Sequence, residues 1–327
     1  VEAAGTSTQR ADASGLSAGI VALGANVSTA DTLATTTAST GEKVKLHAAT
    51  TTVEAASESD NLAEATAGGG GVVSGLASQA TTRDTSTTLA RVGSGQGGSN
   101  ERAIDTDTFT LTADHTSSVN SRVDSTNASV VGASGAMASN TVTAVTSAVI
   151  DDAARIKADS LTVWAHNSAQ KPWLSTLAYP WLPGVPEWNV KSGSGGLFDL
   201  PAARSDTGIS QRALVRVGDG ASIAQTGSTA NPGKLSLGAE NQVIARDKVK
   251  VDSGGAIAVP GGDSKIRADL NTASVQVGYK ANGTAGDTAA KIDALGDVVI
   301  GTRAEGDIYT QVAVDTYGVA GAPEGNA

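Results

Sequence analysis

Acidic side chains are the residues of this chain that best suit chemistry, because two carboxyl groups can cleave a glycosidic bond as acid and base. Such a pair needs one raised pKa and a separation of about 5–10 Å. The candidates are Asp151, Asp152, Asp219, Asp247 and Asp252. They adjoin turns, where aspartate is common for conformational reasons. We therefore expect that the protein is not an enzyme, and we keep a polysaccharide-cleaving enzyme as the less favoured alternative.

Histidine, cysteine and glycine motifs suggest no cofactor. The chain has 3 His and no Cys, and His47, His115 and His166 are too far apart in the sequence to suggest one metal site. We expect all of them at the surface. Calcium would suit aspartates in turns, but the diagnostic Gly-Gly-x-Gly-x-Asp repeat is absent, and Gly261-Gly262-Asp263 is only a fragment of it. The sequence predicts no catalytic residue and no metal ligand.

Aromatic residues concentrate in one segment. All 4 Trp lie between Trp164 and Trp188, beside half of the 8 Pro. Because proline excludes a regular helix or central strand, we predict a long excursion at residues 169–212. Three interpretations stay open: a small local core, a contact with a neighbouring chain or domain, and a glycan site. The candidate contact residues are Trp173, Tyr179, Trp181 and Trp188.

The overall composition predicts a thin interior. Only 3% of the 327 residues are aromatic, and much of the apolar 39% is Ala and Val. Such side chains fill a core only where facing backbones lie close together; disorder is the alternative. The net charge is −10, with no basic cluster for nucleic acid. No apolar run reaches the roughly 20 residues of a membrane span, so we expect no membrane insertion.

Similar phrases recur along the chain. Gly19-Ile20-Val21, Gly71-Val72-Val73 and Ser129-Val130-Val131 each open one copy. They are roughly 50–60 residues apart, which we interpret as two or three coils of a solenoid with about 20–25 residues per coil. The predicted rod then has about 13–16 coils and a length of about 60–80 Å.

The best internal match lies between residues 152–167 and 219–241. It places Leu161, Val163, Ala165 and Asn167 against Leu235, Leu237, Ala239 and Asn241. The second copy is seven residues longer, and we place the additional residues in the loop 226–232. Solenoids vary in this way, with insertions confined between strands that keep their pattern.

Strands with one inward face fit the rest of the pattern. Apolar residues flank single intervening residues in six pairs: Val215 and Val217, Leu235 and Leu237, Val249 and Val251, Ile257 and Val259, Val275 and Val277, and Val298 and Ile300. Short one-sided strands also make β-sandwiches, but the small β-branched side chains favour stacked coils. We predict an all-β solenoid with coils at 1–168 and 213–327, separated by the excursion at 169–212.

Several phrases resemble the repetitive stalks of large bacterial surface proteins. These are Gly68–Gly75, Asn127–Gly135 and Ala154–Val163. The similarity is to filamentous haemagglutinin-like adhesins and leukotoxin-type filamentous adhesins, and it covers nearly the whole chain outside 169–212. It implies a right-handed parallel β-helix, export through the outer membrane and a role in adhesion. It supplies no catalytic residues.

The sequence thus predicts a structural and adhesive rod segment at the bacterial cell surface. Because the chain begins at Val1 without Met, we expect an internal piece of a larger protein. The expected partners are further coils of the same chain, neighbouring copies, or a glycan or protein on host or community cells. The alternative is a self-assembling filament or sheath subunit with residues 169–212 at the chain–chain contact.

Overall fold

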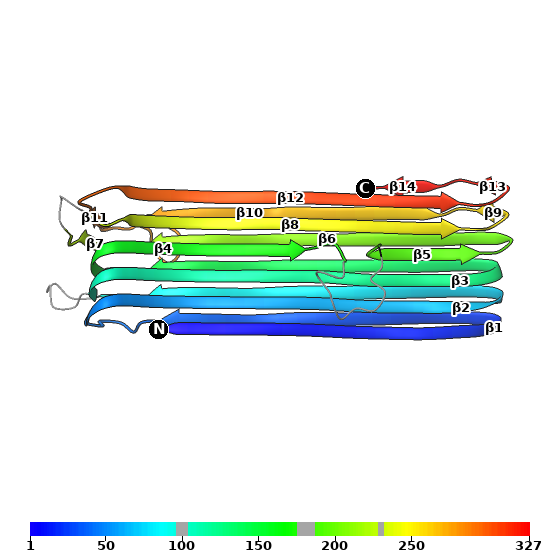
Figure 1. Ribbon diagram of the computed structural model, residues 1–327, viewed down its shortest axis with the longest axis horizontal. Helices are drawn as coiled ribbons and strands as arrows, with labels where there is room; N and C mark the ends of the chain where they lie inside the picture. Colours follow the sequence, from blue (N-terminus) through cyan, green and yellow to red (C-terminus); the bar gives the residue numbers. More distant parts are fainter. Residues whose placement is uncertain (96–103, 175–186, 228–231) are drawn as a thin grey trace.

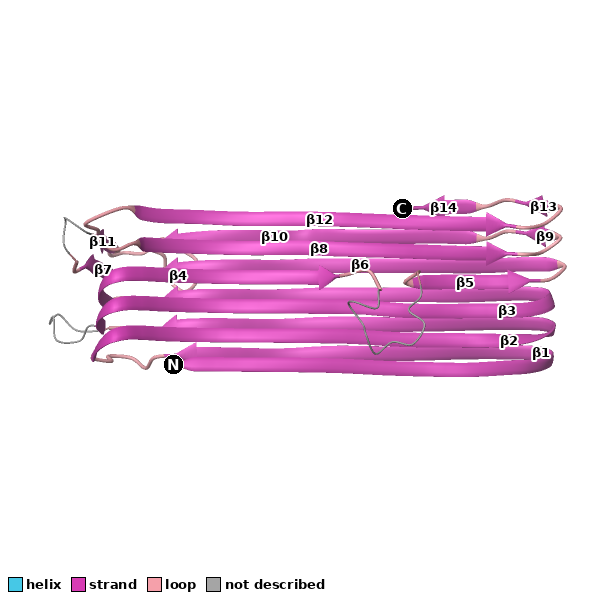
Figure 2. Cartoon of the chain, in the orientation of Figure 1, coloured by secondary structure: helices cyan, strands magenta, loops and turns pink. Residues whose placement is uncertain are grey.

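The computed structural model describes residues 1–95, 104–174, 187–227 and 232–327. In these residues the regular structure is strand throughout, without helix (Figure 2), so the all-β prediction is confirmed. Within the same ranges, no helix is long and apolar enough to cross a lipid bilayer. The strands are β1 (Glu2–Ser39), β2 (Leu46–Val92), β3 (Ile104–Ile150), β4 (Arg155–Lys171), β5 (Val190–Gly195), β6 (Phe198–Val217), β7 (Ser222–Gln225), β8 (Leu235–Ser253), β9 (Ile257–Ala258), β10 (Gly261–Val277), β11 (Lys291–Asp293), β12 (Val298–Thr316), β13 (Ala320–Gly321) and β14 (Glu324–Asn326).

The chain winds in successive turns, and we call one such turn a circuit. The named strands pair in parallel with the strands at the same place in the next circuit (Figure 1). One column of paired residues crosses the molecule through Val21, Val73, Val131, Phe198 and Ile257. Partners in neighbouring strands are 52 to 74 positions apart in the sequence. The chain therefore returns to the same place repeatedly, displaced each time by one strand spacing of about 4.8 Å.

Each circuit has an outgoing and a returning half that face one another. In Figure 1 the long strands β1, β2 and β3 run to the right-hand edge, bend there and return. Side chains meet across the interior: the hydroxyls of Ser7 and Thr32 lie 3.2 Å apart, and those of Ser57 and Thr88 lie 2.6 Å apart. The molecule therefore has two layers with a narrow interior between them.

Alternate residues of both layers fill this interior. Val53 and Leu111 of the outgoing half pack in one cluster with Val92 and Ile150 of the returning half. Alanine is frequent in the same cluster, because facing strands this close leave no room for a second layer of large side chains. Val249 and Val251 are fully buried as predicted, whereas Ile257 and Val259 are about half exposed, contrary to the prediction. They follow the sharp bend, where the inward–outward alternation is interrupted.

The internal match found in the sequence is a real pairing. Leu161 pairs with Leu235 and Asn167 with Asn241, whereas slightly earlier Ala158 pairs with Gln225. The register therefore changes by the seven predicted residues within the stretch that holds the loop 226–232, of which 228–231 lie outside the described residues.

The predicted coil length of 20–25 residues is wrong. The phrases at Gly19, Gly71 and Ser129 are direct neighbours in the pairing, so their spacing is one circuit and not two or three. The strands are longer than average because the flat two-layer body bends sharply only at its edges. The predicted number of coils and the predicted rod length, which rest on that coil length, are therefore wrong as well.

The predicted excursion at 169–212 is too long. Residues 190–195 and 198–217 form β5 and β6 and pair with β3. Lys171 still belongs to β4 and pairs with Ala245. Between β4 and β5 the described residues outside the strands are 172–174 and 187–189, and residues 175–186 lie outside the described residues.

Candidate contact site at the tryptophan-rich insertion

A buried ion pair lies where the chain leaves β4. Lys171 is fully buried, and its Nζ donates hydrogen bonds of 2.9 Å to Oδ1 of Asp247 and to the carbonyl of Arg246. The other carboxylate oxygen of Asp247 accepts a 3.0 Å bond from Ser264. Because a buried charge without a partner is costly, the two side chains satisfy each other at the break between β4 and β5.

Two asparagines bind both ends of the insertion, by which we mean the stretch between the end of β4 at Lys171 and the start of β5 at Val190. Asn120 donates a 2.8 Å hydrogen bond to the carbonyl of Pro172, where the chain departs. Asn189, where it returns, donates a 2.8 Å bond to Oδ1 of Asn120 and accepts a 3.0 Å bond from the amide of Lys248. Both side chains are fully buried. The departure and return points are thus fixed against the neighbouring strands β3 and β8.

Two tryptophans next to these anchors gather around a lysine on the outer face. Nζ of Lys248 lies 4.7 Å from the ring centroid of Trp173 and 5.9 Å from that of Trp188. Lys250 lies 5.7 Å from the Trp188 ring, and Tyr309 meets Trp173 edge-on at 5.5 Å between ring centroids. Lys248 and Lys250 point outward because Val249 and Val251 between and beyond them point into the core. We call these five residues, Trp173, Trp188, Lys248, Lys250 and Tyr309, the aromatic–lysine cluster.

The cluster combines flat apolar surface with positive charge. The tryptophans are half-buried and Tyr309 is exposed. Burial lowers the pKa of Lys250, but its hydrogen bond to Asp252 and the negative charges of Asp252 and Asp315 outweigh this, so the pKa lies above its ordinary value. Lys250 therefore stays charged at neutral pH. Each lysine–ring contact at an exposed site contributes about 0.5–1 kcal/mol.

Two of the four residues predicted as contacts lie in this cluster. Trp173 and Trp188 come together as described, whereas Tyr179 and Trp181 lie outside the described residues. The sequence interpretation missed Lys248, Lys250 and Tyr309. These residues are distant in the sequence, and only the stacking of β8 and β12 beside the insertion brings them near.

The acidic residues considered for catalysis do not form one pair with free carboxylates. Asp151 accepts bonds from Arg91 at 2.5 Å and Arg216 at 2.9 Å. Oδ1 of Asp152 accepts from Arg216 at 3.1 Å and from the amide of Asp219 at 3.0 Å. Asp151 and Asp152 thus fix the turn after β3.

The remaining candidates are also held in structural contacts. The carboxylate of Asp219 accepts amide hydrogen bonds from Asp287 and Thr288 in the next circuit. Asp247 is the partner of Lys171, and Asp252 lies between Lys191 and Lys250 at 3.5 and 3.3 Å. Asp219 and Asp252 thus act as turn and surface residues, whereas Asp247 is buried within β8, contrary to the expectation that it adjoins a turn.

His115 corrects the expectation that all histidines lie at the surface. It is buried, with Nδ1 2.6 Å from the hydroxyl of Ser57 and Nε2 3.4 Å from Oδ2 of Asp84. The order Ser–His–Asp resembles a hydrolase triad, but the His115 ring that would have to exchange a proton with a substrate is buried, and the Ser57 hydroxyl is shared with Thr88. The geometry suits a polar interior column, in which Nδ1 of His115 is within hydrogen-bond distance of Ser57 while Nε2 has no hydrogen-bond partner among the described residues.

No metal site is evident in the described ranges, where no three His, Asp or Glu side chains converge. His47 is exposed beside Asp105, and His166 contacts Asp114. No family model matches the chain, and neither a curated protein nor a solved structure matches it.

Proposed function

We propose that the chain is a right-handed parallel β-helix that acts as a structural and adhesive rod segment of a large bacterial surface protein. The observation that carries the proposal is the continuous parallel pairing, in which each circuit lies on the one before it from β1 to β12. Such a body is extended by adding circuits, and each circuit depends chiefly on its direct neighbours. It supplies reach and attachment without catalysis.

The interior suits a load-bearing role. Main-chain hydrogen bonds connect each inner circuit to both neighbours, and interior columns of Ala, Val, Ser and Thr repeat along the same direction. Force along the rod would have to break many parallel bonds together. The composition without Cys suits passage through an oxidising compartment, which supports an extracellular, cell-surface location.

The aromatic–lysine cluster is the attachment site in this proposal. Indole rings stack on the apolar faces of sugars, and lysine ammonium groups attract carboxylates and sulfates. The ligand class that fits both features is an acidic glycan of a host or community cell surface.

A binding experiment tests the attachment site. The chain is applied to immobilised acidic polysaccharides and to their neutral counterparts, with Trp173→Ala/Trp188→Ala as the variant. We expect the native chain to bind the acidic polymer, and the variant to lose about 10-fold or more in affinity. Trp164→Ala is the matched control, because Trp164 is also a half-buried outward tryptophan but is no member of the cluster. Equal binding by the native chain and the double variant would exclude this site.

The rod itself is tested separately. Cryo-electron microscopy of the isolated chain should show a flat particle with a repeat of about 4.8 Å across its strands, perpendicular to the long dimension of Figure 1. Particles without that repeat would contradict the β-helix, whatever the binding experiment gives. New reducing ends released from an acidic polysaccharide by the chain would contradict the non-catalytic role.

A further inference from the structure

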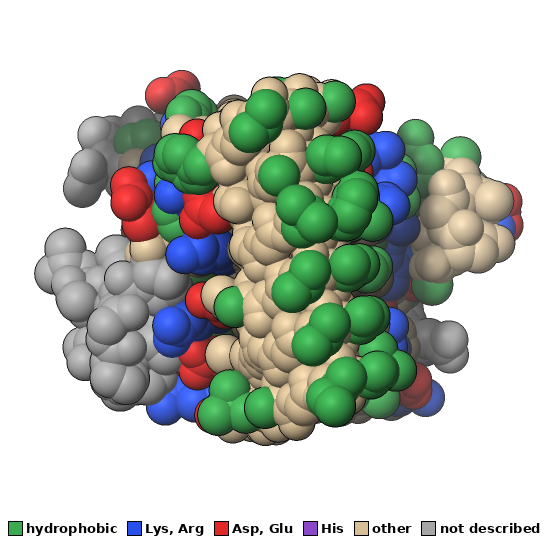
Figure 3. Space-filling model, turned by 90° about the vertical axis from the view of Figure 1, so that its right-hand side faces the viewer, with side chains coloured by type: hydrophobic (Ala, Val, Ile, Leu, Met, Phe, Trp, Pro, Cys, Tyr) green, Lys and Arg blue, Asp and Glu red, His purple; other side chains and the backbone are tan. Residues whose placement is uncertain are grey.

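Each circuit bends sharply at a small residue on the edge that Figure 3 faces. The bend residues are Gly19, Gly71, Ser129, Gly196, Gly255 and Gly318. A Cβ added at Gly71, Gly196 or Gly318 would collide with a main-chain carbonyl of the preceding circuit. This close approach makes the bend tight, and the side chains that follow it turn outward together instead of alternating.

The outward side chains form a continuous apolar edge ridge. The ridge consists of Ile20, Val21, Val72, Val73, Val130, Val131, Leu197, Phe198, Ile257 and Val319, which are 42% to 93% exposed. Figure 3 shows hydrophobic side chains running as a band from top to bottom of this face, with charged side chains on both sides. Main-chain pairing stacks the ridge residues one strand spacing apart.

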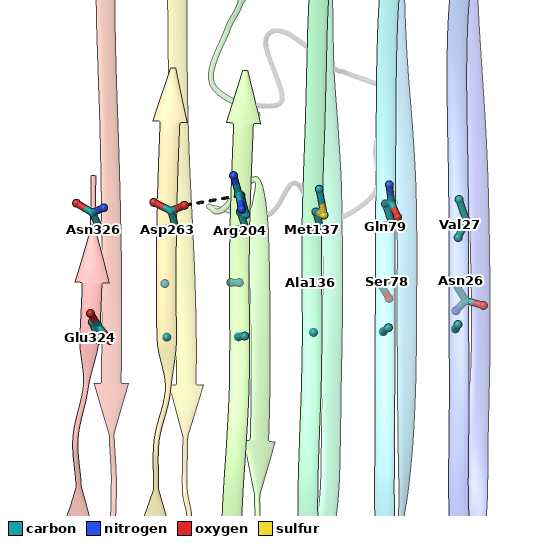
Figure 4. Close-up of a pocket in the computed structure, with 17 residues that line it drawn as sticks. Asn26, Val27, Ser78, Gln79, Ala136, Met137, Arg204, Asp263, Glu324 and Asn326 are labelled. Atoms are coloured by element: carbon teal, nitrogen blue, oxygen red, sulfur yellow. Dashed lines mark ion pairs between the residues drawn. The ribbon is translucent and has the colours of Figure 1, made fainter. Parts of the chain in front are cut away.

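A shallow trough lies beside the ridge on the returning layer (Figure 4). It encloses about 720 Å³. Its floor is a column of outward-facing small residues: Ala25, Ala77, Gly135, Ala202 and Gly261. One side of the trough is formed by the residues two positions further along each strand, namely Val27, Gln79, Met137, Arg204 and Asp263. Arg204 and Asp263 lie 3.7 Å apart and neutralise one another.

The exposed apolar area is too large for an ordinary monomer surface. From the exposed fractions, the ridge presents on the order of 1,000 Å² of apolar side chain, whereas the largest patch of a typical monomer is about 300–600 Å². A stable interface buries about 800 Å² on each partner. The ridge and trough together therefore provide the area that a specific interface needs.

We propose that a second copy of this chain covers the ridge, with the ridge of each copy seated in the trough of the other. Ridge and trough run in the same direction and share the strand spacing as their period, so side chains of one copy can fit between the rows of its partner. Because the two features lie side by side, one two-fold axis forms both contacts at once, as an isologous dimer requires. From β1 to β10 the ridge and the trough floor carry no charge that would need a partner on the other copy, and Glu324 of β14, which pairs with Gly261, ends the floor.

This contact differs from the one expected for a filament subunit, which involved residues 169–212. It also does not depend on the adhesive role. Each copy carries a net charge of −10, so salt should strengthen ridge-mediated association by screening the repulsion. An association held by Lys248 and Lys250 against acidic groups should weaken with salt instead.

Sedimentation velocity across a concentration series provides the first test. We expect the native chain to form a dimer, and Val73→Lys/Val131→Lys to weaken the dimer by about 100-fold or more, because two ammonium groups would be buried in an apolar interface. Leu33→Lys and Leu270→Lys are matched controls, because both residues are exposed apolar strand residues outside the ridge. A monomeric native chain, or equal loss in the controls, would overturn the proposal.

Cross-linking provides a test that does not depend on the stability of lysine variants. The chain has no Cys, so a Val131→Cys chain can be mixed with a Met137→Cys chain and treated with a short bis-maleimide. Ridge-to-trough packing predicts mixed dimers that a Leu270→Cys chain does not form with either. Absence of mixed dimers would overturn the proposal, as would capture by phosphatidylcholine vesicles in place of self-association, since a lipid surface would then be the partner of the ridge.

Discussion

At the scale of single residues, the interior columns contain ionisable side chains whose burial would be unfavourable without hydrogen bonds from neighbouring residues. Asp84 is fully buried and accepts hydrogen bonds from Ser59 and Ser86, with the His115 ring beside it. Burial raises its pKa, but these contacts outweigh burial and hold the pKa below its ordinary value of 3.8. The carboxylate is therefore the form that the fold stabilises.

A prediction on pH follows from this direction. A depressed folded-state pKa contributes stability above the unfolded value, and this stability is lost as the pH falls below about 3.8 through the folded pKa. Asp84→Asn should destabilise the chain by about 1–3 kcal/mol at neutral pH. It should also reduce the loss of unfolding free energy between neutral and acidic pH. Urea unfolding at pH 7 and pH 3 measures both effects. Asp31→Asn, an exposed position on β1, is the control, and an unchanged acid profile for Asp84→Asn would refute the assignment.

The Lys171–Asp247 pair gives a second prediction at this scale. Lys171→Met leaves a buried carboxylate without its cation and should cost about 3–5 kcal/mol, whereas Lys171→Met/Asp247→Leu should cost less. Lys191→Met should cost less than about 1 kcal/mol, because its pair with Asp252 is partly exposed. A double-mutant cycle from urea unfolding separates these terms. If the double variant were less stable than Lys171→Met, the main role of the pair would not be to neutralise two buried charges.

Single-residue roles were only partly predictable from the sequence. The clustering of Trp173 and Trp188 with prolines indicated the insertion, because such a composition is foreign to the rest of the chain. The inward direction of His115 continues the alternation of Phe109, Leu111 and Ala113, which the sequence interpretation did not extend to it. Its contacts with Ser57 and Asp84 were not predictable, because stacking between circuits sets them.

At the scale of strands, outward residues of neighbouring circuits must match in size. Trp164 of β4 pairs with Gly238 of β8, and a Cβ built on Gly238 would overlap the indole ring of Trp164. The ring thus lies across the neighbouring strand in space that only glycine leaves free.

Gly238→Ala should therefore destabilise the chain by about 1–3 kcal/mol through overpacking. Adding Trp164→Ala should restore most of this loss, because the obstructing ring is removed. Gly208→Ala is the control, since that glycine lies in β6 with open space around it. Thermal unfolding of Gly238→Ala, Trp164→Ala, the double variant, Gly208→Ala and the native chain measures the effect. Failure of Trp164→Ala to compensate would show that Gly238 is required for its backbone instead.

Strand register was predictable where large residues repeat, and circuit length was not. The match of Leu161 and Asn167 to Leu235 and Asn241 succeeded because leucine and asparagine are rare enough to mark positions. The length of a circuit depends on where the chain bends. A bend at Gly19-Ile20-Val21 is locally similar to a strand that starts after glycine, and the apolar residues suggested an inward face. The structure turns them outward and thereby creates the ridge.

At the scale of the whole molecule, stability should vary with the number of neighbours that a circuit has. β3 has paired strands on both sides, whereas β1 pairs only with β2 in the described residues. In a stack held by nearest-neighbour contacts, opening of an outer circuit breaks one interface and opening of an inner circuit breaks two. Local unfolding should therefore begin at β1 and at β12.

Hydrogen exchange followed by mass spectrometry tests this gradient. We expect amides of β3 and β4 to exchange most slowly and amides of β1 and β12 fastest, with β2 and β8 between them, because each step inward adds an interface that must open. Dilution should leave this order unchanged, since the proposed dimer covers the bends and not the outer edges of β1 or β12. If β1 were as protected as β3 and lost that protection on dilution, another chain would be pairing with its free edge, and end-to-end assembly would replace lateral assembly as the mode of association. Equal protection at all dilutions would mean that the circuits open as one unit, contrary to a nearest-neighbour stack.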